Sequence, residues 1–345
     1  MLLDLVGDIS VSLQQQEEID GALWKACASS GGKLQAATIG RSESGRELLG
    51  FVAGSGPCKV SLIAGCHADE PVGPETLRLL VRTLASLHGD GEALLDDFTF
   101  CIVCHVNPDG EAVNRPWMEQ WPDAIEYLKH AARELPGRDV EFAFPDRRPE
   151  NRAVAAFLQK HGPFRMHASL HGMGFSDGAL LLIDRRWGFR TDALQNRFRE
   201  TAAAAGLTLH DHNRRGEKGF FYLGPGFSTT PEGEAMRVFF RAAGDEETAS
   251  RFGESSMDFV RSLGGDPLCL VTELPLFLIG REEASPPGRP EAYLRFRRRL
   301  VPPRAAGDIE KMWQLMEDYN VRSVTLESAV RMQLQILEAG LETVR

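Results

Sequence analysis

The chain has 345 residues, 43% of them hydrophobic and 26% charged, which is typical of a globular protein with room for a large core. Its formal net charge of -10 argues against nucleic acid as a partner, because phosphate binding needs a clustered positive surface. Without a basic leader or a long apolar run, and with six irregularly spaced cysteines, we expect a cytoplasmic protein that does not bind membranes.

Short apolar runs alternate with helical patterns through most of the chain. Two strand-like runs on either side of residues 41–46 predict a hairpin. After it we expect strands at 58–65, 98–106, 165–172, 179–184 and 267–274, and helices at 74–88, 149–162 and 192–206. This alternation predicts an α/β fold, a single domain whose mostly parallel or mixed central sheet is covered by helices on both faces.

Two further segments depart from this alternation. Residues 206–255 are rich in glycine, phenylalanine and charge without a clear period, and we expect them to form a lid or a pocket wall. Helical patterns return near the end of the chain, at 308–320 and 327–344. We therefore predict a catalytic domain over residues 1–302. A helical extension over residues 303–345 should pack on that domain or on a second copy of the chain, as in a homo-oligomer, and should be dispensable for the chemistry.

Side chains with metal-binding chemistry follow two of the predicted strands. His67 and Glu70 lie just after the strand 58–65, and His171 lies at the end of the strand 165–172. In sheets of this kind, ligands bind beyond the carboxyl ends of the strands. Each residue alone is better explained as a packed histidine or a helix cap. Together, two imidazoles and one carboxylate are the ligand set of a catalytic zinc site with a position open for water, and they predict one Zn²⁺ per chain.

These motifs resemble those of the zinc carboxypeptidases of the carboxypeptidase A type. The resemblance runs in order from about residue 17 to about residue 280. It is carried by His67-x-x-Glu70, the turn Asn107-Pro108-Asp109-Gly110, His171 after "ASL", and "TEL" at 272–274. It implies that the three residues named above bind zinc and that Glu273 is the general base. A glutamate inside the apolar run "LCLVTELPLFL" also favours function, because a buried strand acid has no obvious structural purpose.

The sequence departs from the family where a C-terminal carboxylate is bound. Glu141, in "DVEFAF" (139–144), stands where the family has an Asn-Arg pair, and Asp69 lies between two ligands where arginine is frequent. Met118 occupies the register of the family's catalytic arginine, and only a shifted alignment would give that role to Arg115. Acids in these places repel a carboxylate and favour a neutral or positive group.

The resemblance also adds Met257, in the specificity segment "SSMDF" (255–259), to Asp69, Arg115 and Glu141 as substrate-binding candidates. We therefore expect a zinc-dependent hydrolase that cleaves a peptide or amide bond in a small substrate without a free C-terminal carboxylate. One alternative is a deacylase of the aspartoacylase or succinylglutamate desuccinylase kind. The other is a non-catalytic module that holds a cationic ligand in the same cleft.

Four other polar residues are weaker candidates for the metal site. The resemblance gives Asp109 the role of orienting a ligating histidine. We expect His167 to be packed or to support a ligand, and we expect His210 and His212 to lie in a solvated loop.

Overall fold

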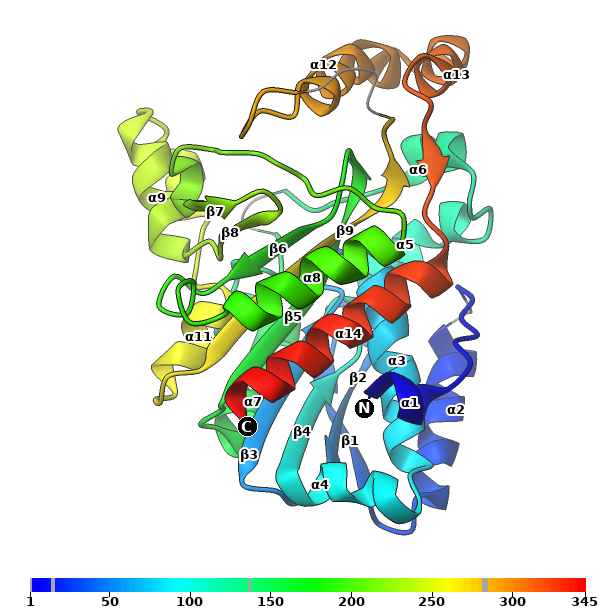
Figure 1. Ribbon diagram of the computed structural model, residues 1–345, viewed down its shortest axis with the longest axis vertical. Coiled ribbons are helices and arrows are strands. Elements are labelled where there is room, and N and C mark those ends of the chain that lie inside the picture. Colours follow the sequence, from blue (N-terminus) through cyan, green and yellow to red (C-terminus); the bar gives the residue numbers. More distant parts are fainter. Residues whose placement is uncertain (1, 14–15, 136–137, 281–284) are drawn as a thin grey trace.

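One mixed sheet crosses the computed structural model, which describes residues 2–13, 16–135, 138–280 and 285–345 (Figure 1). The strands lie side by side in the order β1 (Leu34–Arg41), β2 (Glu47–Ala53), β4 (Phe98–Val103), β3 (Cys58–Ala64), β5 (Met166–Ser176), β9 (Leu268–Leu278), β6 (Leu180–Ile183), β8 (Phe227–Thr229) and β7 (Tyr222–Gly224). The short β10 (Arg322–Ser323) pairs with the end of β9. Strands β4, β3, β5 and β9 are parallel, and β2 and β6 flank them in the antiparallel direction. The predicted mixed sheet is confirmed.

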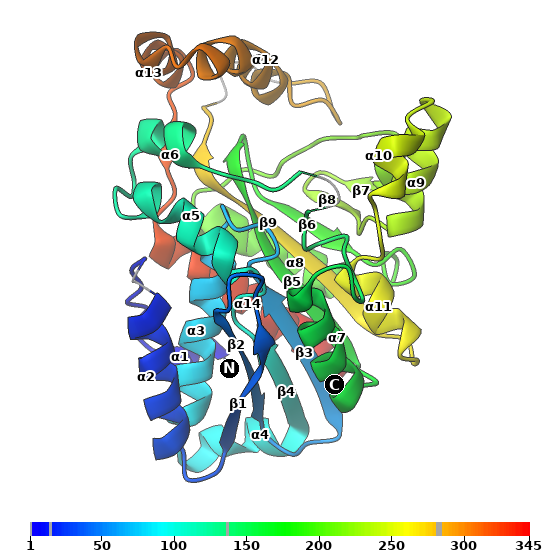
Figure 2. The same cartoon turned by 180° about the vertical axis from the view of Figure 1, so that it is seen from behind.

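Helices cover both faces of this sheet, as predicted. The face seen in Figure 1 carries α3 (Val72–Ala85), α8 (Asp192–Ala204) and α14 (Leu326–Val344), with α1 (Leu2–Val6) and α2 (Gln16–Ser29) beside α3. The opposite face carries α7 (Pro149–His161) and α11 (Ser256–Ser262), which are in front in Figure 2. The remaining helices are α4 (Ala93–Asp97), α5 (Pro108–Met118), α6 (Ala124–His130), α9 (Gly233–Ala242), α10 (Glu246–Ser250), α12 (Glu291–Ala306) and α13 (Ile309–Asp318), with 3-10 turns at Gly89–Glu92 and Glu217–Gly219.

The alternation of side chains along β3 explains why two layers of helices are needed. Val60 and Leu62 pack into the larger apolar core, which includes the inner sides of α3 and α14. Ile63 points to the other face and packs into a second core, where it joins Val154 of α7 and Val260 of α11. Successive residues of a strand point to opposite sides, so a central strand with apolar residues on both sides must be covered twice.

The segment predicted as a tight turn after β4 is the beginning of a helix. Asn107 caps α5, and its side-chain oxygen accepts a hydrogen bond of 3.0 Å from the backbone nitrogen of Gly110. Pro108 is the first helical residue, where its missing N–H costs nothing. The residues after β4 therefore form the first turn of α5 and not an open loop. Helix α5 packs against α6.

The C-terminal helices are part of the main body of the molecule. Helix α12 runs across the boundary expected between residues 302 and 303, and Leu334, Leu337 and Val330 of α14 are buried in the larger core. Gln333 is fully buried beneath β5 and β9. Its amide oxygen accepts a hydrogen bond from Thr76 Oγ1 at 2.6 Å. Its amide nitrogen donates to the carbonyl oxygen of His171 at 3.2 Å and to Thr272 Oγ1 at 3.0 Å. These hydrogen bonds connect α14 to α3 and to the strands β5 and β9.

Gln333→Ala should lower the free energy of unfolding by about 2–4 kcal/mol, because it leaves a cavity and unpaired buried polar groups. Urea unfolding measures this loss. Gln335→Ala, two residues further along the same helix and only partly buried, is the matched control and should cost about 0.5 kcal/mol or less. Equal losses in the two variants would show that the buried amide does not connect α14 to the sheet.

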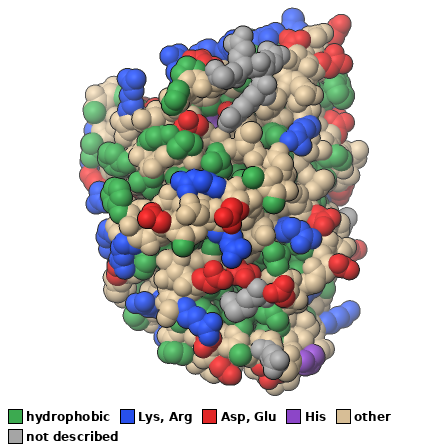
Figure 3. All heavy atoms as spheres, viewed as in Figure 1, with side chains coloured by type: hydrophobic (Ala, Val, Ile, Leu, Met, Phe, Trp, Pro, Cys, Tyr) green, Lys and Arg blue, Asp and Glu red, His purple; other side chains and the backbone are tan. Residues whose placement is uncertain are grey.

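Charged side chains of both signs are interspersed over the face shown in Figure 3, with apolar side chains between them. Large apolar side chains are also exposed on the C-terminal helices, including Val301 of α12 and Trp313 of α13. Within the described part of the chain, no helix combines the length and apolar character needed to cross a membrane.

Candidate active site

Two glycines bring the loop after β3 against its neighbours. Gly65 has a φ of +75°, and a side chain there would meet the ring of His105 at 2.5 Å. At Gly73, in the first turn of α3, a Cβ atom would lie 2.4 Å from the carbonyl oxygen of Leu170. The absence of a side chain at Gly73 lets the start of α3 approach β5 just before His171. The loop between β3 and α3 thereby lies over the end of β5.

Three predicted metal ligands converge on one point at this end of the sheet. The Nδ1 atoms of His67 and His171 are 3.1 Å apart. Glu70 Oε2 lies 2.9 Å from His171 Nδ1, and Glu70 Oε1 lies 3.2 Å from His67 Nδ1. Ligand atoms on a tetrahedral zinc ion are separated by about 3.3 Å, because zinc–ligand bonds are about 2.0–2.1 Å long. The three side chains are therefore spaced as a zinc ion requires.

The outer ring nitrogens of both histidines have partners that leave Nδ1 free to bind a metal. His67 Nε2 lies 3.5 Å from Asp139 Oδ2. His171 Nε2 lies 2.9 Å from Ser169 Oγ and 3.1 Å from Glu141 Oε2. A carboxylate that accepts a hydrogen bond from Nε2–H fixes the tautomer in which Nδ1 carries a lone pair. The residues present therefore fit a zinc ion.

The acid beside His67 is Asp139. The prediction that Asp109 orients a ligating histidine is wrong. Asp109 lies in α5 and accepts hydrogen bonds from Ser42 Oγ at 2.8 Å and from the backbone nitrogen of Ser44 at 2.9 Å. It also forms an ion pair of 2.9 Å with Arg46. Asp109 therefore connects α5 to the turn between β1 and β2.

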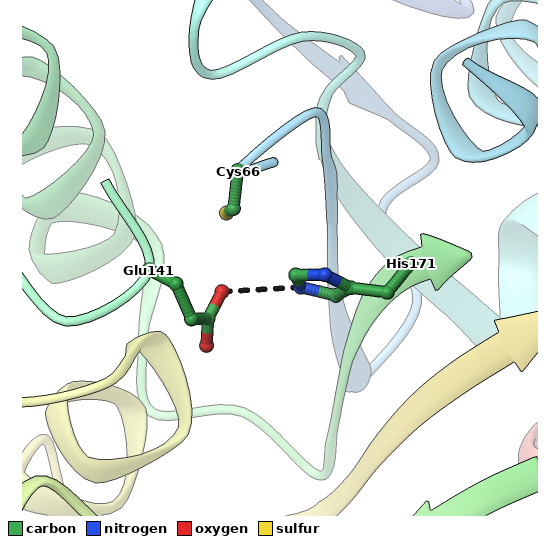
Figure 4. Close-up of side chains that lie close together, drawn as sticks. All are labelled: Cys66, Glu141 and His171. Atoms are coloured by element: carbon green, nitrogen blue, oxygen red, sulfur yellow. Dashed lines mark hydrogen bonds and ion pairs between the residues drawn. The ribbon is translucent and has the colours of Figure 1, made fainter. Parts of the chain in front are cut away.

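A second group of potential ligands lies on the far side of the His171 ring. Cys66 Sγ, a Glu141 oxygen and His171 Nε2 all lie within 4.8 Å of one another (Figure 4). Burial and the neighbouring Glu141 raise the pKa of the Cys66 thiol to about 12. Glu141 and Ser169 both contact His171 Nε2, so this group supports the ring from behind. The predicted ligands His67 and Glu70 lie on the Nδ1 side of the ring.

Glu141→Gln should weaken zinc binding by about 10- to 100-fold, because an amide oxygen accepts the His171 N–H more weakly than a carboxylate does. Competition with a chromogenic chelator measures the affinity. Glu254→Gln, an exposed carboxylate whose backbone pairs with Phe144, is the control and should bind zinc as the unmodified chain does. Unchanged affinity in Glu141→Gln would mean that Ser169 alone holds the ring.

The pairing of β5 with β9 places Glu273 beside the predicted metal ligands. Its Cα atom is the direct neighbour of His171 across the two parallel strands. Burial and the adjacent Glu70 carboxylate raise the pKa of Glu273 to about 7, and a bound cation would lower it. A carboxylate with a pKa near the working pH is suited to accept and return a proton.

A cavity of about 690 Å³ opens beside Glu273. Its walls come from the end of β5, from β6, from the segment around α6 and from α12. Arg214 and Phe220 of the segment 206–255 also line it, so part of that segment forms a pocket wall as expected. A volume of this size is typical of a site for a small molecule or a short peptide segment.

Arg133, which no sequence pattern indicated, lies at the cavity wall beside the predicted metal ligands. Its Nε donates to Asp69 Oδ1 at 2.9 Å, and its Nη2 donates to Glu70 Oε1. Tyr127 donates its hydroxyl to the other oxygen of Asp69 at 3.3 Å. Arg133 follows α6 in a segment without hydrophobic periodicity and contacts acids more than sixty residues earlier, so no local pattern signals its role.

Asp69 is one of the described residues that line the cavity. The other three substrate-binding candidates are not among those lining residues. Arg115 is turned away, with Nη2 3.3 Å from Glu111 Oε1 and Nη1 3.3 Å from the carbonyl oxygen of Leu13. Glu141 is buried behind His171, and Met257 is packed in an apolar cluster with Leu180, Leu182, Cys269 and Val271. The expectation that these three residues face the substrate is therefore corrected.

Two other histidines that were considered for the site, His167 and His210, are buried inside the protein. His167 lies between Ser61 Oγ at 2.8 Å and Ser256 Oγ at 3.1 Å, in the packed position that was expected. His210 does not lie in a solvated loop, because it is buried with its Nδ1 2.6 Å from Asp177 Oδ1. Neither histidine approaches the metal ligands as a donor.

Part of this chain is similar to a known protein family. Residues 24–177 match the sequence profile of the zinc carboxypeptidases. Carboxypeptidase M of Mus musculus is 29% identical over 191 residues, which are 50% of this chain and 41% of that protein. The chain therefore spans less than half the length of this curated relative.

Solved metallo-carboxypeptidases share the fold. The structure of a Pseudomonas aeruginosa metallo-carboxypeptidase in complex with (2-guanidinoethylmercapto)succinic acid has a TM-score of 0.55 and 16% identity, covering 96% of this chain and 70% of that chain. Carboxypeptidase A from Helicoverpa armigera has a TM-score of 0.54 and 11% identity, covering 99% of this chain and 79% of that one. At these identities the likeness shows the fold alone.

Proposed function

The chain is a divergent relative of the zinc carboxypeptidases, and on this premise we propose that it is a zinc-dependent hydrolase of a peptide or amide bond. The observation that carries the proposal is the convergence of His67 Nδ1, Glu70 and His171 Nδ1 within 3.2 Å of one another, with Glu273 on the neighbouring strand. Those three residues would hold one Zn²⁺, and the cavity beside them would hold the substrate.

The roles of the chain's own residues follow from their positions. Zinc, when bound, would supply a Lewis acid that polarises the scissile carbonyl and acidifies water. Glu273 takes the proton of the attacking water and returns it to the leaving amine. Asp139 and Glu141 keep the ligand rings in orientation. Arg133, at the cavity wall, offers hydrogen-bond donors to an oxygen that becomes negative.

The expected preference for substrates without a free C-terminal carboxylate loses its support. It required the charges of Asp69 and Glu141 to face the substrate. Asp69 is paired with Arg133 at 2.9 Å, and Glu141 contacts His171 outside the cavity. A neutralised acid and an acid behind the metal ligand exert little repulsion on a carboxylate in the cavity.

Removal of the metal tests the proposed function. A library of N-acyl and peptidyl amides, with and without free carboxylates, should contain compounds that the purified protein cleaves. Dialysis against 1,10-phenanthroline should abolish that cleavage, and about one equivalent of Zn²⁺ per chain should restore it. Cleavage that persists in the metal-free protein would exclude a zinc hydrolase. Cleavage confined to N-acyl amino acids would instead favour the deacylase alternative.

A further inference from the structure

The cavity beside Glu273 has a charge balance opposite to that of the whole chain. Its lining includes two carboxylates, those of Asp69 and Glu273, and four guanidinium groups, those of Arg133, Arg214, Arg297 and Arg304. The chain as a whole has a formal net charge of -10. A cavity that gathers cations on an acidic protein attracts an anionic ligand.

Among the residues that the structure describes, no acid balances the charge of three of these arginines. Arg133 is paired with Asp69 and Glu70. In the described ranges of the chain, no carboxylate forms an ion pair with Arg214, Arg297 or Arg304. Cations left unpaired at the wall of a cavity are available to the anionic groups of a ligand.

Aromatic rings of the cavity wall hold two of the unpaired guanidinium groups. The guanidinium carbon of Arg214 lies 4.3 Å from the centroid of the Phe220 ring. Arg297 Nη1 donates to the hydroxyl of Tyr293 at 3.3 Å, one turn earlier on α12. A guanidinium has five N–H donors, so these contacts leave most of them free.

The guanidinium group of Arg304 contacts α6 and the residue that follows it. Its Nε donates to the carbonyl oxygen of Leu128 and its Nη2 to that of Ala131, both at 3.1 Å. Arg304 is seven residues beyond Arg297 on α12, a separation of about 10 Å along a helix. Arg297 leans toward Tyr293 at the start of the helix, whereas Arg304 bonds to α6. Because different partners hold the two guanidinium groups, each can offer its remaining N–H donors to a carboxylate of its own.

We propose that the substrate carries at least two anionic groups, as an acidic peptide does, and that separate carboxylates bind Arg297 and Arg304, with Arg214 as a further cation of the cavity lining. The inference rests on the proposed function for the position of the scissile bond beside Glu273. The binding of the anionic groups does not depend on hydrolysis and can be measured without it.

Four probe peptides of equal length test this inference: one with two glutamates and one with two glutamines, each as the free acid and as the C-terminal amide. They are titrated by calorimetry into the zinc-loaded Glu273→Gln protein, which should bind without cleaving. At low salt the glutamate peptides should bind about tenfold more tightly than the glutamine peptides, in both the acid and the amide forms. This preference should shrink as salt is added.

Two neighbouring arginines of α12 give a matched pair of variants in that background. Arg297→Gln should lower the affinity for the glutamate peptides by about threefold, which is about half of their advantage in binding free energy, because Arg304 still binds the second carboxylate. Arg298→Gln, exposed and outside the cavity lining, should leave it unchanged.

Equal affinity for the glutamate and glutamine peptides would overturn the inference, and so would equal losses in the two arginine variants. A preference for free acids over amides, with no effect of the glutamates, would also overturn it, because a terminal carboxylate alone would then be bound. If the glutamate peptides bind more tightly but the unmodified, zinc-loaded protein cleaves none of the probes or library compounds, the proposed function fails and the anion site stands.

Discussion

Glu273→Gln should reduce turnover by about 10²- to 10⁴-fold while leaving the bound zinc and the fold in place. Glutamine has nearly the same shape as glutamate but cannot take a proton from water. Glu273 is the direct neighbour of His171 across β5 and β9, and the cavity opens onto its side chain. Initial rates on any substrate found in the amide library, with zinc content measured on the same preparation, give the result.

The control for this substitution is Glu310→Gln, on the exposed side of α13, which should behave as the unmodified protein does. Turnover within a few-fold of normal in Glu273→Gln, with zinc retained, would mean that another group removes the proton. Loss of zinc together with turnover would mean that Glu273 holds the site together and is not the base.

His171→Ala should remove most of the zinc, because three protein ligands share the binding free energy and the loss of one costs about 3 kcal/mol or more. His67→Ala should have the same effect. Zinc per chain, measured by elemental analysis after gel filtration in zinc-free buffer, gives the comparison.

His167→Ala is a demanding control for the metal prediction. His167 lies on the same strand as His171, four residues earlier, and is also fully buried, but it contacts Ser61 and Ser256. Its removal should lower stability through a cavity and leave the zinc content unchanged. Zinc lost equally from both variants would show that damage to β5, and not the missing ligand, releases the metal.

The metal-ligand candidates could be predicted because their positions relative to the predicted strands can be seen in the sequence. Each of them lies at the end of a predicted strand, and the carboxyl ends of parallel strands meet at one edge of a sheet. The pairing of His171 with Glu273 also follows once β5 and β9 are neighbours. The mixed sheet, the two layers of helices and the approximate position of the site could therefore be predicted from hydrophobic patterns and a few motifs.

The surroundings of the ligands could not be predicted, because they depend on contacts between distant segments. Asp109 and Asp139 both follow core elements, and the path of the chain between α6 and α7 decides that Asp139 reaches His67. The charge of Asp69 suggested a cationic substrate until Arg133 was found beside it. The sequence shows that Asp69 is charged but not which basic residue pairs with it, because Arg133 lies 64 residues further along the chain.

The contact of α14 with the sheet could have been predicted from one residue of its sequence. Gln333 interrupts an apolar stripe on a helix that is otherwise suited to burial, and a buried amide must find hydrogen-bond partners. Its partners are Thr76, Thr272 and the carbonyl oxygen of His171, so α14 supports the strand that carries His171.

The central claim is that one zinc ion sits between the Nδ1 atoms of His67 and His171 and the carboxylate of Glu70. Anomalous diffraction at the zinc absorption edge, from crystals of the zinc-loaded protein, locates the ion directly. We expect one strong peak per chain about 2.0–2.2 Å from those three ligand atoms. A peak on the other side of the His171 ring, between Cys66 and Glu141, or no peak beside His67 and Glu70, would contradict it.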